Sequence, residues 1–325
     1  MSQSIRHKMI IDTDPGVDDA MAIFTAIAHP EIELLGLTTT FGNVSVERAT
    51  QNALTLLEMS GLDIPVAGGV SVPEQKEPAP FPDFIHGADG FGNVNLPSPV
   101  RKAVDKDAAD FIIETVMAHP GEVSLVAIGP LGNLALALER EPLIARNVKQ
   151  VVIMGGSIAE GGNVSPVAEA NIFSDPHAAD KVMTAEWPLV MVGLDVTHQV
   201  LLTRGLFAEI KDRNQKVGAF MQQAATFYID FYRREREAAD GCFGHDVSAV
   251  IYVTNPDLFE TQEGSIRVVP DGIAVGQTIM RRNQSRQYPV TAWDNQPVQK
   301  ACMQVDSVGV VEVFSQAMSN DYWKT

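Results

Sequence analysis

Short apolar runs bounded by turn residues alternate along the chain with stretches in which apolar residues recur at helical spacing. The strand and helix pairs that this pattern predicts are Met9–Asp12 with Val17–His29, Ile32–Thr40 with Val46–Ser60, Val123–Ile128 with Leu131–Leu138, Val148–Met154 with Pro176–Ala185, and Leu189–Gly193 with Gly205–Lys211. Such alternation predicts an α/β fold, with a single doubly wound, mainly parallel (Rossmann-like) sheet and helices on both of its faces.

Two segments depart from the alternation. Val70–Asp105 carries six prolines around His86, and because a loop of this length is usually functional, we expect it near the site. Lys216–Arg236 is predicted to be a long helix, followed by a small C-terminal β region and a closing helix; these are Ile266–Val275, Thr278–Arg282 and Val290–Trp293 as strands and Val308–Met318 as the helix. We find no repeat or linker in the sequence, so residues 1–325 are expected to form one domain.

The composition is that of a globular protein, with 45% hydrophobic and 20% charged residues among 325. The 24 basic and 41 acidic residues leave a net charge of −17, so we expect neither nucleic acid nor a membrane surface as a partner. Without an apolar run long enough for a membrane span or a signal peptide, the chain is expected to be cytoplasmic. Cys242 and Cys302 lack the spacing of a zinc or redox site and are expected to be reduced thiols.

Four carboxylates follow the first predicted strand within eight residues, in Asp12-Thr13-Asp14-Pro15-Gly16-Val17-Asp18-Asp19. Ligands bind at the carboxyl ends of parallel strands, and such a cluster needs water, protons or a cation to relieve its repulsion. All-oxygen ligands suit Ca²⁺ or Mg²⁺ rather than zinc. The glycine spacing and the lack of a glutamate at the twelfth position exclude an EF-hand. A solvated, acid-rich helix start is the simpler alternative, but it would not normally follow a fully apolar strand.

Further polar residues lie where other predicted strands end or helices begin. They are Asn43, the segment Ile128–Asn133, the segment Met154–Gly156 with Asn163, Glu169 and Asn171 after it, and the pair His245-Asp246. Each alone is weak, because Gly-Asn is usually a turn and His-Asp is usually a helix cap. Together they predict one ligand site at one edge of the sheet.

With these motifs in this order, the chain resembles the inosine-uridine-preferring nucleoside hydrolases, which are calcium-dependent N-ribohydrolases. The resemblance extends from about Lys8 to about Val253. The segment Asp12–Ala20 matches the N-terminal signature of that family, and Met154-Gly155-Gly156, Glu169-Ala170-Asn171 and His245-Asp246 agree with it.

The resemblance implies a role for each matching position. It implies Ca²⁺ as the cofactor, bound by Asp14, Asp19, Asp246 and the main-chain carbonyl of Ile128. It also implies substrate contacts by Asp18, Asn43, Met154, Asn163, Glu169 and Asn171, a place near the nucleobase for His86, and a role for His245 as acid to the departing base. The implied partner is a small-molecule ribonucleoside, and the implied assembly is a homodimer or homotetramer.

The implied chemistry is hydrolysis of the N-glycosidic bond, which passes through a ribosyl cation resembling an oxocarbenium ion. Calcium would lower the pKa of a water under C1′, and Asp14 would take its proton. The preferred base stays open, because Ala170 stands where some members carry an aromatic ring and Val247-Ser248 depart from the usual pattern. The sequence does not reveal the pathway, salvage or catabolism. Candidates for the base contact are Tyr228, Phe231, Tyr232 and Arg233 in the segment 228–236, or Trp293.

Two other functions compete with nucleoside hydrolysis. A haloacid-dehalogenase-type phosphohydrolase would use Asp12 as nucleophile and Asp14 as acid and base, but only Asp195-Val196-Thr197 supports its other requirements. A non-catalytic ribose-binding module could share the scaffold, since a fold does not imply an activity. The presence of His245 together with the predicted metal aspartates argues against that module.

Overall fold

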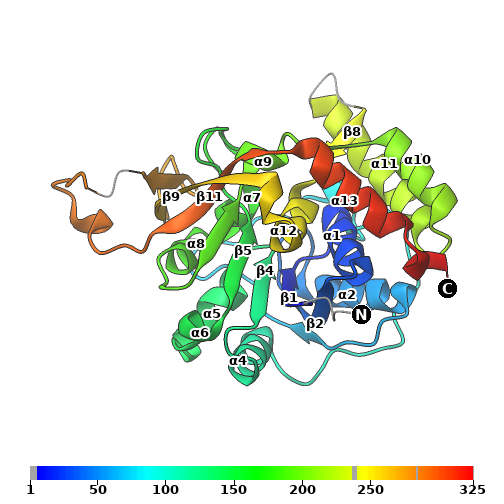
Figure 1. Cartoon of the computed structure of the whole chain (residues 1–325), viewed down its shortest axis with the longest axis horizontal. Helices are drawn as coiled ribbons and strands as arrows, with labels where there is room; N and C mark the ends of the chain where they lie inside the picture. The colour runs from blue at the N-terminus through cyan, green and yellow to red at the C-terminus, as the bar shows by residue number, and fades with distance from the viewer. Residues whose placement is uncertain (1–5, 236–239, 283–284, 325) are drawn as a thin grey trace.

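A nine-stranded sheet forms the centre of the computed structural model, which describes residues 6–235, 240–282 and 285–324 (Figure 1). The strand order is β10-β9-β11-β6-β5-β4-β1-β2-β3. The strands are β1 (His7–Thr13), β2 (Ile32–Thr39), β3 (Val66–Gly68), β4 (Val123–Ala127), β5 (Gln150–Met154), β6 (Leu189–Val192), β9 (Phe259–Val268), β10 (Thr278–Arg281) and β11 (Gln299–Val305). Within it, β9 runs antiparallel to β10 and β11, and the other neighbouring strands pair in parallel. The mainly parallel sheet is confirmed, with the C-terminal β region as its mixed edge.

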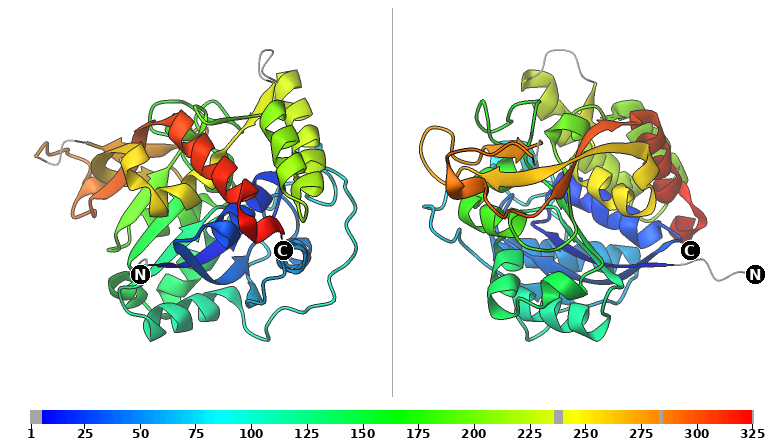
Figure 2. Two further views of the ribbon diagram at one scale, coloured as in Figure 1. Left: turned by 45° about the vertical axis from the view of Figure 1, so that its right-hand side comes forward. Right: turned by 60° about the vertical axis from the view of Figure 1, so that its left-hand side comes forward.

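Helices cover both faces of the sheet (Figure 2). The helices are α1 (Val17–Ala28), α2 (Val46–Ser60), α3 (Asp83–His86), α4 (Ala108–Ala118), α5 (Gly132–Arg140), α6 (Ile144–Asn147), α7 (Ala170–Ser174), α8 (Pro176–Met183), α9 (Leu194–Thr197), α10 (Arg204–Arg213), α11 (Gly218–Glu235), α12 (His245–Thr254) and α13 (Ser307–Ser319), with short 3-10 helices at Pro256–Leu258, Thr291–Trp293 and Asp321–Lys324. Successive residues of β1 pack alternately into two apolar cores, one on each face of the sheet. Met9 and Ile11 pack with α1, α2, α11, α12 and α13, whereas Ile10 packs with α4, α5, α6 and α8. None of the described helices is long and apolar enough to cross a membrane.

The chain order of the sheet reverses at β1. From β1 the chain passes to β2 on one side, and it later returns to the other side of β1 as β4. The carboxyl ends of β1 and β4 therefore form a topological switch point, which is where open α/β sheets bind ligands. The acidic segment after β1 begins at this point.

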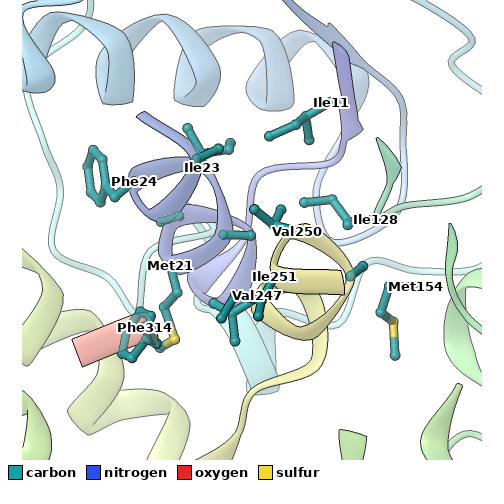
Figure 3. Close-up of a cluster of buried hydrophobic side chains, with 14 of the residues drawn as sticks. Ile11, Met21, Ile23, Phe24, Ile128, Met154, Val247, Val250, Ile251 and Phe314 are labelled. Atoms are coloured by element: carbon teal, nitrogen blue, oxygen red, sulfur yellow. The ribbon is translucent and has the colours of Figure 1, made fainter. Parts of the chain in front are cut away.

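Helix α12 packs against α1, although the two are far apart in the sequence (Figure 3). Val247, Val250 and Ile251 of α12 belong to the same apolar cluster as Met21 of α1 and Ile128 after β4. Because α12 is buried along its whole apolar length, its first turn is held firmly beside the first turn of α1. This packing brings His245 and Asp246 to the acids that follow β1.

Several local predictions need correction. Val290–Trp293 is not a strand, because Thr291–Trp293 form a 3-10 helix and Val290 is 59% exposed, so no packing favours an extended chain there. The strand predicted at Ile266–Val275 runs instead over Phe259–Val268 and ends before the Pro270-Asp271-Gly272 turn. The prediction also missed β3, β11, α4 and the two-stranded sheet of β7 (Leu201–Thr203) and β8 (Gly241–Phe243). Arg236, the expected end of α11, lies outside the described residues.

Candidate functional site

A cavity of about 290 Å³ opens at the switch point and is called the first cavity below. Most of the predicted site residues line it, namely Asp18, Asn43, His86, Ile128, Met154, Asn163, Glu169, Asn171, His245 and Asp246. Asp14 and Asp19 do not line it; both are buried, and both are hydrogen-bonded to Asn43. The prediction of one site formed by distant segments therefore agrees with where the structure places these residues.

Three carboxylates meet closely in this site. Oxygen atoms of Asp18, Asp19 and Asp246 lie within 4.8 Å of one another, an arrangement that can hold a metal ion. Asp19 is fixed by the loop it belongs to, because its carboxylate accepts hydrogen bonds from Thr13 Oγ1 at 2.5 Å and from the Gly16 N–H at 2.9 Å. The sequence had suggested Asp18 as a ribose contact, whereas its position in this cluster also suits a metal ligand.

Asp14 sits beside the cluster with one oxygen occupied and one unused. Its Oδ2 accepts the Asn43 N–H at 2.6 Å, and its buried Oδ1 has no hydrogen-bond partner among the described residues. The backbone approaches closely from two sides, since a Cβ on Gly42 would lie 1.9 Å from Asp14 Oδ2 and a Cβ on Gly129 would lie 2.6 Å from Oδ1. Glycine is therefore required at Gly42 and Gly129, because a side chain at either position would collide with the Asp14 carboxylate.

The electrostatics of the cluster favour a cation. Burial raises the pKa of Asp18 and of Asp19 to about 6 each, and burial together with neighbouring acids raises the pKa values of Asp14 and Asp246 well above the usual range. Among the described residues, no Lys or Arg lines the first cavity. A hard divalent cation would relieve this repulsion. The Oδ1 atoms of Asp14 and Asp18, which accept no hydrogen bond from the described residues, are oxygens of the kind it binds.

The polar side chains around α7 are held by the backbone. Glu169 begins the helix, and its carboxylate accepts the N–H groups of Asn171 at 2.9 Å and Gly156 at 3.0 Å. The Asn171 amide donates to the carbonyl oxygens of Ile128 and Met154, at 3.1 Å each. Asn163 accepts the Ala170 N–H at 3.0 Å. These contacts place the predicted ribose-binding groups on the wall of the first cavity.

Tyrosine and histidine side chains form another part of the wall. The Tyr228 hydroxyl donates to Asp18 Oδ2 at 2.9 Å and lies 3.2 Å from the Tyr232 hydroxyl. Tyr232 in turn lies 3.0 Å from His245 Nε2, and Thr197 Oγ1 lies 2.8 Å from His245 Nδ1. A continuous chain of hydrogen-bonding groups thus connects α9, α12 and α11 with the acidic cluster.

His86 is held in one tautomer. The Val17 N–H donates to His86 Nδ1 at 3.3 Å, so Nε2 carries the proton of the neutral ring. Burial lowers the pKa of His86 to about 4, which keeps the ring neutral at physiological pH. At this wall of the cavity His86 offers an N–H donor rather than a charge.

The structure separates the candidates for base contact. Tyr228, Phe231 and Tyr232 line the first cavity, whereas Arg233 is exposed and neither Arg233 nor Trp293 is among the described residues that line it. Thr197 and His198 were not among the predicted site residues; they follow β6 in the Asp195-Val196-Thr197-His198 segment. A polar run after an apolar strand is a usable signal for site residues, but here it was taken only as support for a phosphohydrolase.

The fold and the site together define an α/β protein with a cavity beside a cluster of acids at a switch point. A family model described as inosine-uridine preferring nucleoside hydrolase matches residues 9–312. A probable uridine nucleosidase 2 from Arabidopsis thaliana is 42% identical over 95% of this chain and 96% of its own length. An inosine-uridine preferring nucleoside hydrolase from Leishmania major is 40% identical over 84% of this chain and 87% of its own.

Solved structures agree with these relatives. A plant nucleoside hydrolase superposes with a TM-score of 0.92 at 40% identity, covering 96% of this chain and 98% of its own. A purine-preferring ribonucleoside hydrolase from Gardnerella vaginalis superposes with a TM-score of 0.91 at 35% identity, covering 98% and 100%. The chain belongs to the inosine-uridine preferring nucleoside hydrolase family. Hydrolysis of the ribonucleoside N-glycosidic bond is thereby confirmed, and neither the phosphohydrolase nor the non-catalytic module is supported.

Proposed function

We propose that this enzyme splits ribonucleosides into base and ribose with Asp14 as general base and His245 as leaving-group acid, at a Ca²⁺ site formed by Asp14, Asp19, Asp246 and the Ile128 carbonyl. The observation that carries the proposal is the buried acidic cluster at the first cavity, together with the adjacent Asp14. The Oδ1 atom of Asp14 accepts no hydrogen bond from the described residues. A bound Ca²⁺ would supply charge compensation for the acids and make water more acidic. Asp18 adds a further carboxylate to the same cluster.

Other side chains bind the ribose and transfer the protons. Asp18, Asn43, Asn163, Glu169 and Asn171 orient the ribose through its hydroxyls, with Met154 as the apolar surface beside them. Asp14 accepts the proton of the attacking water as the water oxygen bonds to C1′. The C1′–N bond breaks with its electron pair going to the base, which receives a proton from the His245 side of the cavity. The buried acids also stabilise the positive ribosyl group in the transition state.

The base lies against the tyrosine and histidine wall in this proposal, with His86 donating from Nε2. Relatives 42% and 43% identical to this chain carry the names probable uridine nucleosidase 2 and uridine nucleosidase 1, so uridine is the first substrate to test. A kcat/KM panel with inosine, adenosine, guanosine and cytidine would establish the preference.

By the same resemblance we propose a cytoplasmic enzyme of nucleoside salvage or catabolism. We further propose that residues 1–325 form one domain and that the enzyme assembles as a homodimer or homotetramer.

The test combines removal of calcium with removal of the base. Asp14→Asn keeps the size of the side chain but cannot accept a proton, so kcat on uridine is expected to fall by about 10²–10⁴-fold. Exhaustive chelation should abolish turnover of the wild type, and added Ca²⁺ should restore it. Asp257→Asn, the same change at an exposed site away from the cavity, serves as the control. Full activity of chelated enzyme with no metal by elemental analysis would falsify the calcium assignment.

A further inference from the structure

A second cavity, of about 180 Å³, lies next to the first. Four prolines of the segment between β3 and α3 form one wall, and the loop after β2 and helix α7 form the others; these prolines are Pro73, Pro78, Pro80 and Pro82. Asn43 and Asn171 line both cavities and so stand at the boundary between them. The proline-rich segment thus lies near the site, as its length predicts.

The second cavity leads to Asp14. Four aspartates lie at the site, namely Asp14, Asp18, Asp19 and Asp246. Among the described residues that line the second cavity, Asp14 is the only one of these four, whereas Asp18 and Asp246 line the first cavity. Among the described residues that line it, there is no member of the tyrosine and histidine wall. The second cavity therefore approaches Asp14 from a side that the base-contacting groups do not share.

We propose that the second cavity is the route by which the attacking water reaches Asp14 while a nucleoside fills the first cavity. This inference rests on the proposed role of Asp14 as general base. A bound nucleoside would close the first cavity to solvent, and displacement at C1′ requires the water oxygen to approach opposite the departing base. Water that enters beside Asp14 gives its proton to that carboxylate, its oxygen bonds to C1′, and the C1′–N electron pair leaves with the base.

The walls of the second cavity offer a ribose few hydrogen-bond partners. Phe41, Phe81 and Phe173 are apolar, and Lys76 is already engaged, because its Nζ donates to the Phe173 carbonyl at 2.7 Å. A ribose would lose hydrogen bonds to water there without replacing them. The volume holds several waters, since one water takes about 30 Å³ of liquid.

Hydrogen bonds fix part of the wall of the second cavity. The Glu74 N–H donates to Asp175 Oδ2 at 3.0 Å, and Lys76 is bonded to α7, so the beginning of the proline-rich segment is tied to the protein body. Proline also fixes its own φ and restricts the backbone of the residue before it. The hydrogen bonds of Glu74 and Lys76 therefore fix this part of the wall in the folded chain.

The test narrows the route at its outer opening. Ser71 and Ala79 line the second cavity and are exposed, so Ser71→Phe and Ala79→Phe should obstruct the entrance without disturbing a core. The control is Val72→Phe, because Val72 lies in the same segment, is 53% exposed and does not line the second cavity. We would measure kcat and KM on uridine, and the ratio of methyl riboside to ribose formed in aqueous methanol.

Both obstructed variants are expected to lose about tenfold in kcat, or about 1.4 kcal/mol. Their KM should be unchanged, because the first cavity is untouched. Their share of methyl riboside should fall because methanol is larger than water, whereas Phe81→Ala, which widens the route, should raise that share. Wild-type kcat and product ratio in both obstructed variants, or the same loss in Val72→Phe, would overturn the route. Failure of Asp14→Asn to lower kcat in the intact enzyme would instead contradict the proposed function.

Discussion

His245 is constrained at both ring nitrogens, by Thr197 on one side and by Tyr232 on the other. A proton donor matters only for a poor leaving group, so His245→Ala is expected to lower kcat on uridine by about 10²–10⁴-fold while sparing p-nitrophenyl riboside, whose nitrophenolate leaves unaided. Tyr232→Phe should show the same selectivity if the tyrosine carries the proton onward. Steady-state kinetics on the two substrates measure this. Equal losses on both would assign His245 a structural role.

The residues that could be predicted are those whose chemistry is local. Asp12 lies at the end of β1 and Asp14 follows it, while Asp18 and Asp19 start α1, so their meeting at the sheet edge follows from the order of the chain. The contact of Thr197 with His245 could not be predicted, because it depends on how α9 and α12 pack. Asn52 is a similar case, since its amide ties the carbonyl of Pro15 to that of Asp89 and so links the acidic loop to the His86 loop.

At the scale of elements, one carboxylate holds the loop that carries Asn163. Asp195 in α9 accepts the N–H groups of Ile158 at 2.7 Å, Ala159 at 2.6 Å and Glu160 at 3.1 Å, just before the loop reaches the first cavity. Asp195→Ala should release this segment and raise KM on uridine by about tenfold, with a smaller effect on kcat. Limited proteolysis should then cut the loop sooner than in the wild type. Asp195→Asn keeps one acceptor oxygen and should lie in between; unchanged KM and protease resistance in Asp195→Ala would refute the role.

Elements whose boundaries are marked by capping or turn residues were predictable, and elements without such marks were not. Helix α1 shows its start in Asp18 and Asp19, and its position came close to the prediction. Helix α12 is so rich in buried, β-branched residues that its sequence does not distinguish a helix from a strand. Strand β11 was missed because polar Gln299, Lys300 and Gln304 interrupt its apolar positions, while pairing with β6 and β9 holds it in the sheet.

At the scale of the whole molecule, the fold buries negatively charged groups together, where repulsion and loss of water are most unfavourable. A net charge of −17 surrounds a switch point at which four aspartates are buried together. Packing of α1 against α12 holds this arrangement together, because the two helices share a buried apolar cluster that opposes the local repulsion. A cation bound at this site would add to the stability of the fold.

Calcium should therefore stabilise the protein in a pH-dependent manner. The metal-free pKa of Asp18 and of Asp19 is about 6, above the value near 3.9 of an unfolded chain, so the folded metal-free protein binds more protons and loses stability as pH rises from about 4 to about 6. Above that range, Ca²⁺ at a hundred times its Kd should add about 2.7 kcal/mol, or about 4 °C in Tm for a chain of this length. At pH 5 protons compete for the same carboxylates, and the increase should be smaller. Calorimetry with chelator or with Ca²⁺ at pH 5 and pH 7.5 measures both values, with Asp246→Asn as the variant expected to lose the increase; equal shifts at the two pH values would contradict a site formed by these acids.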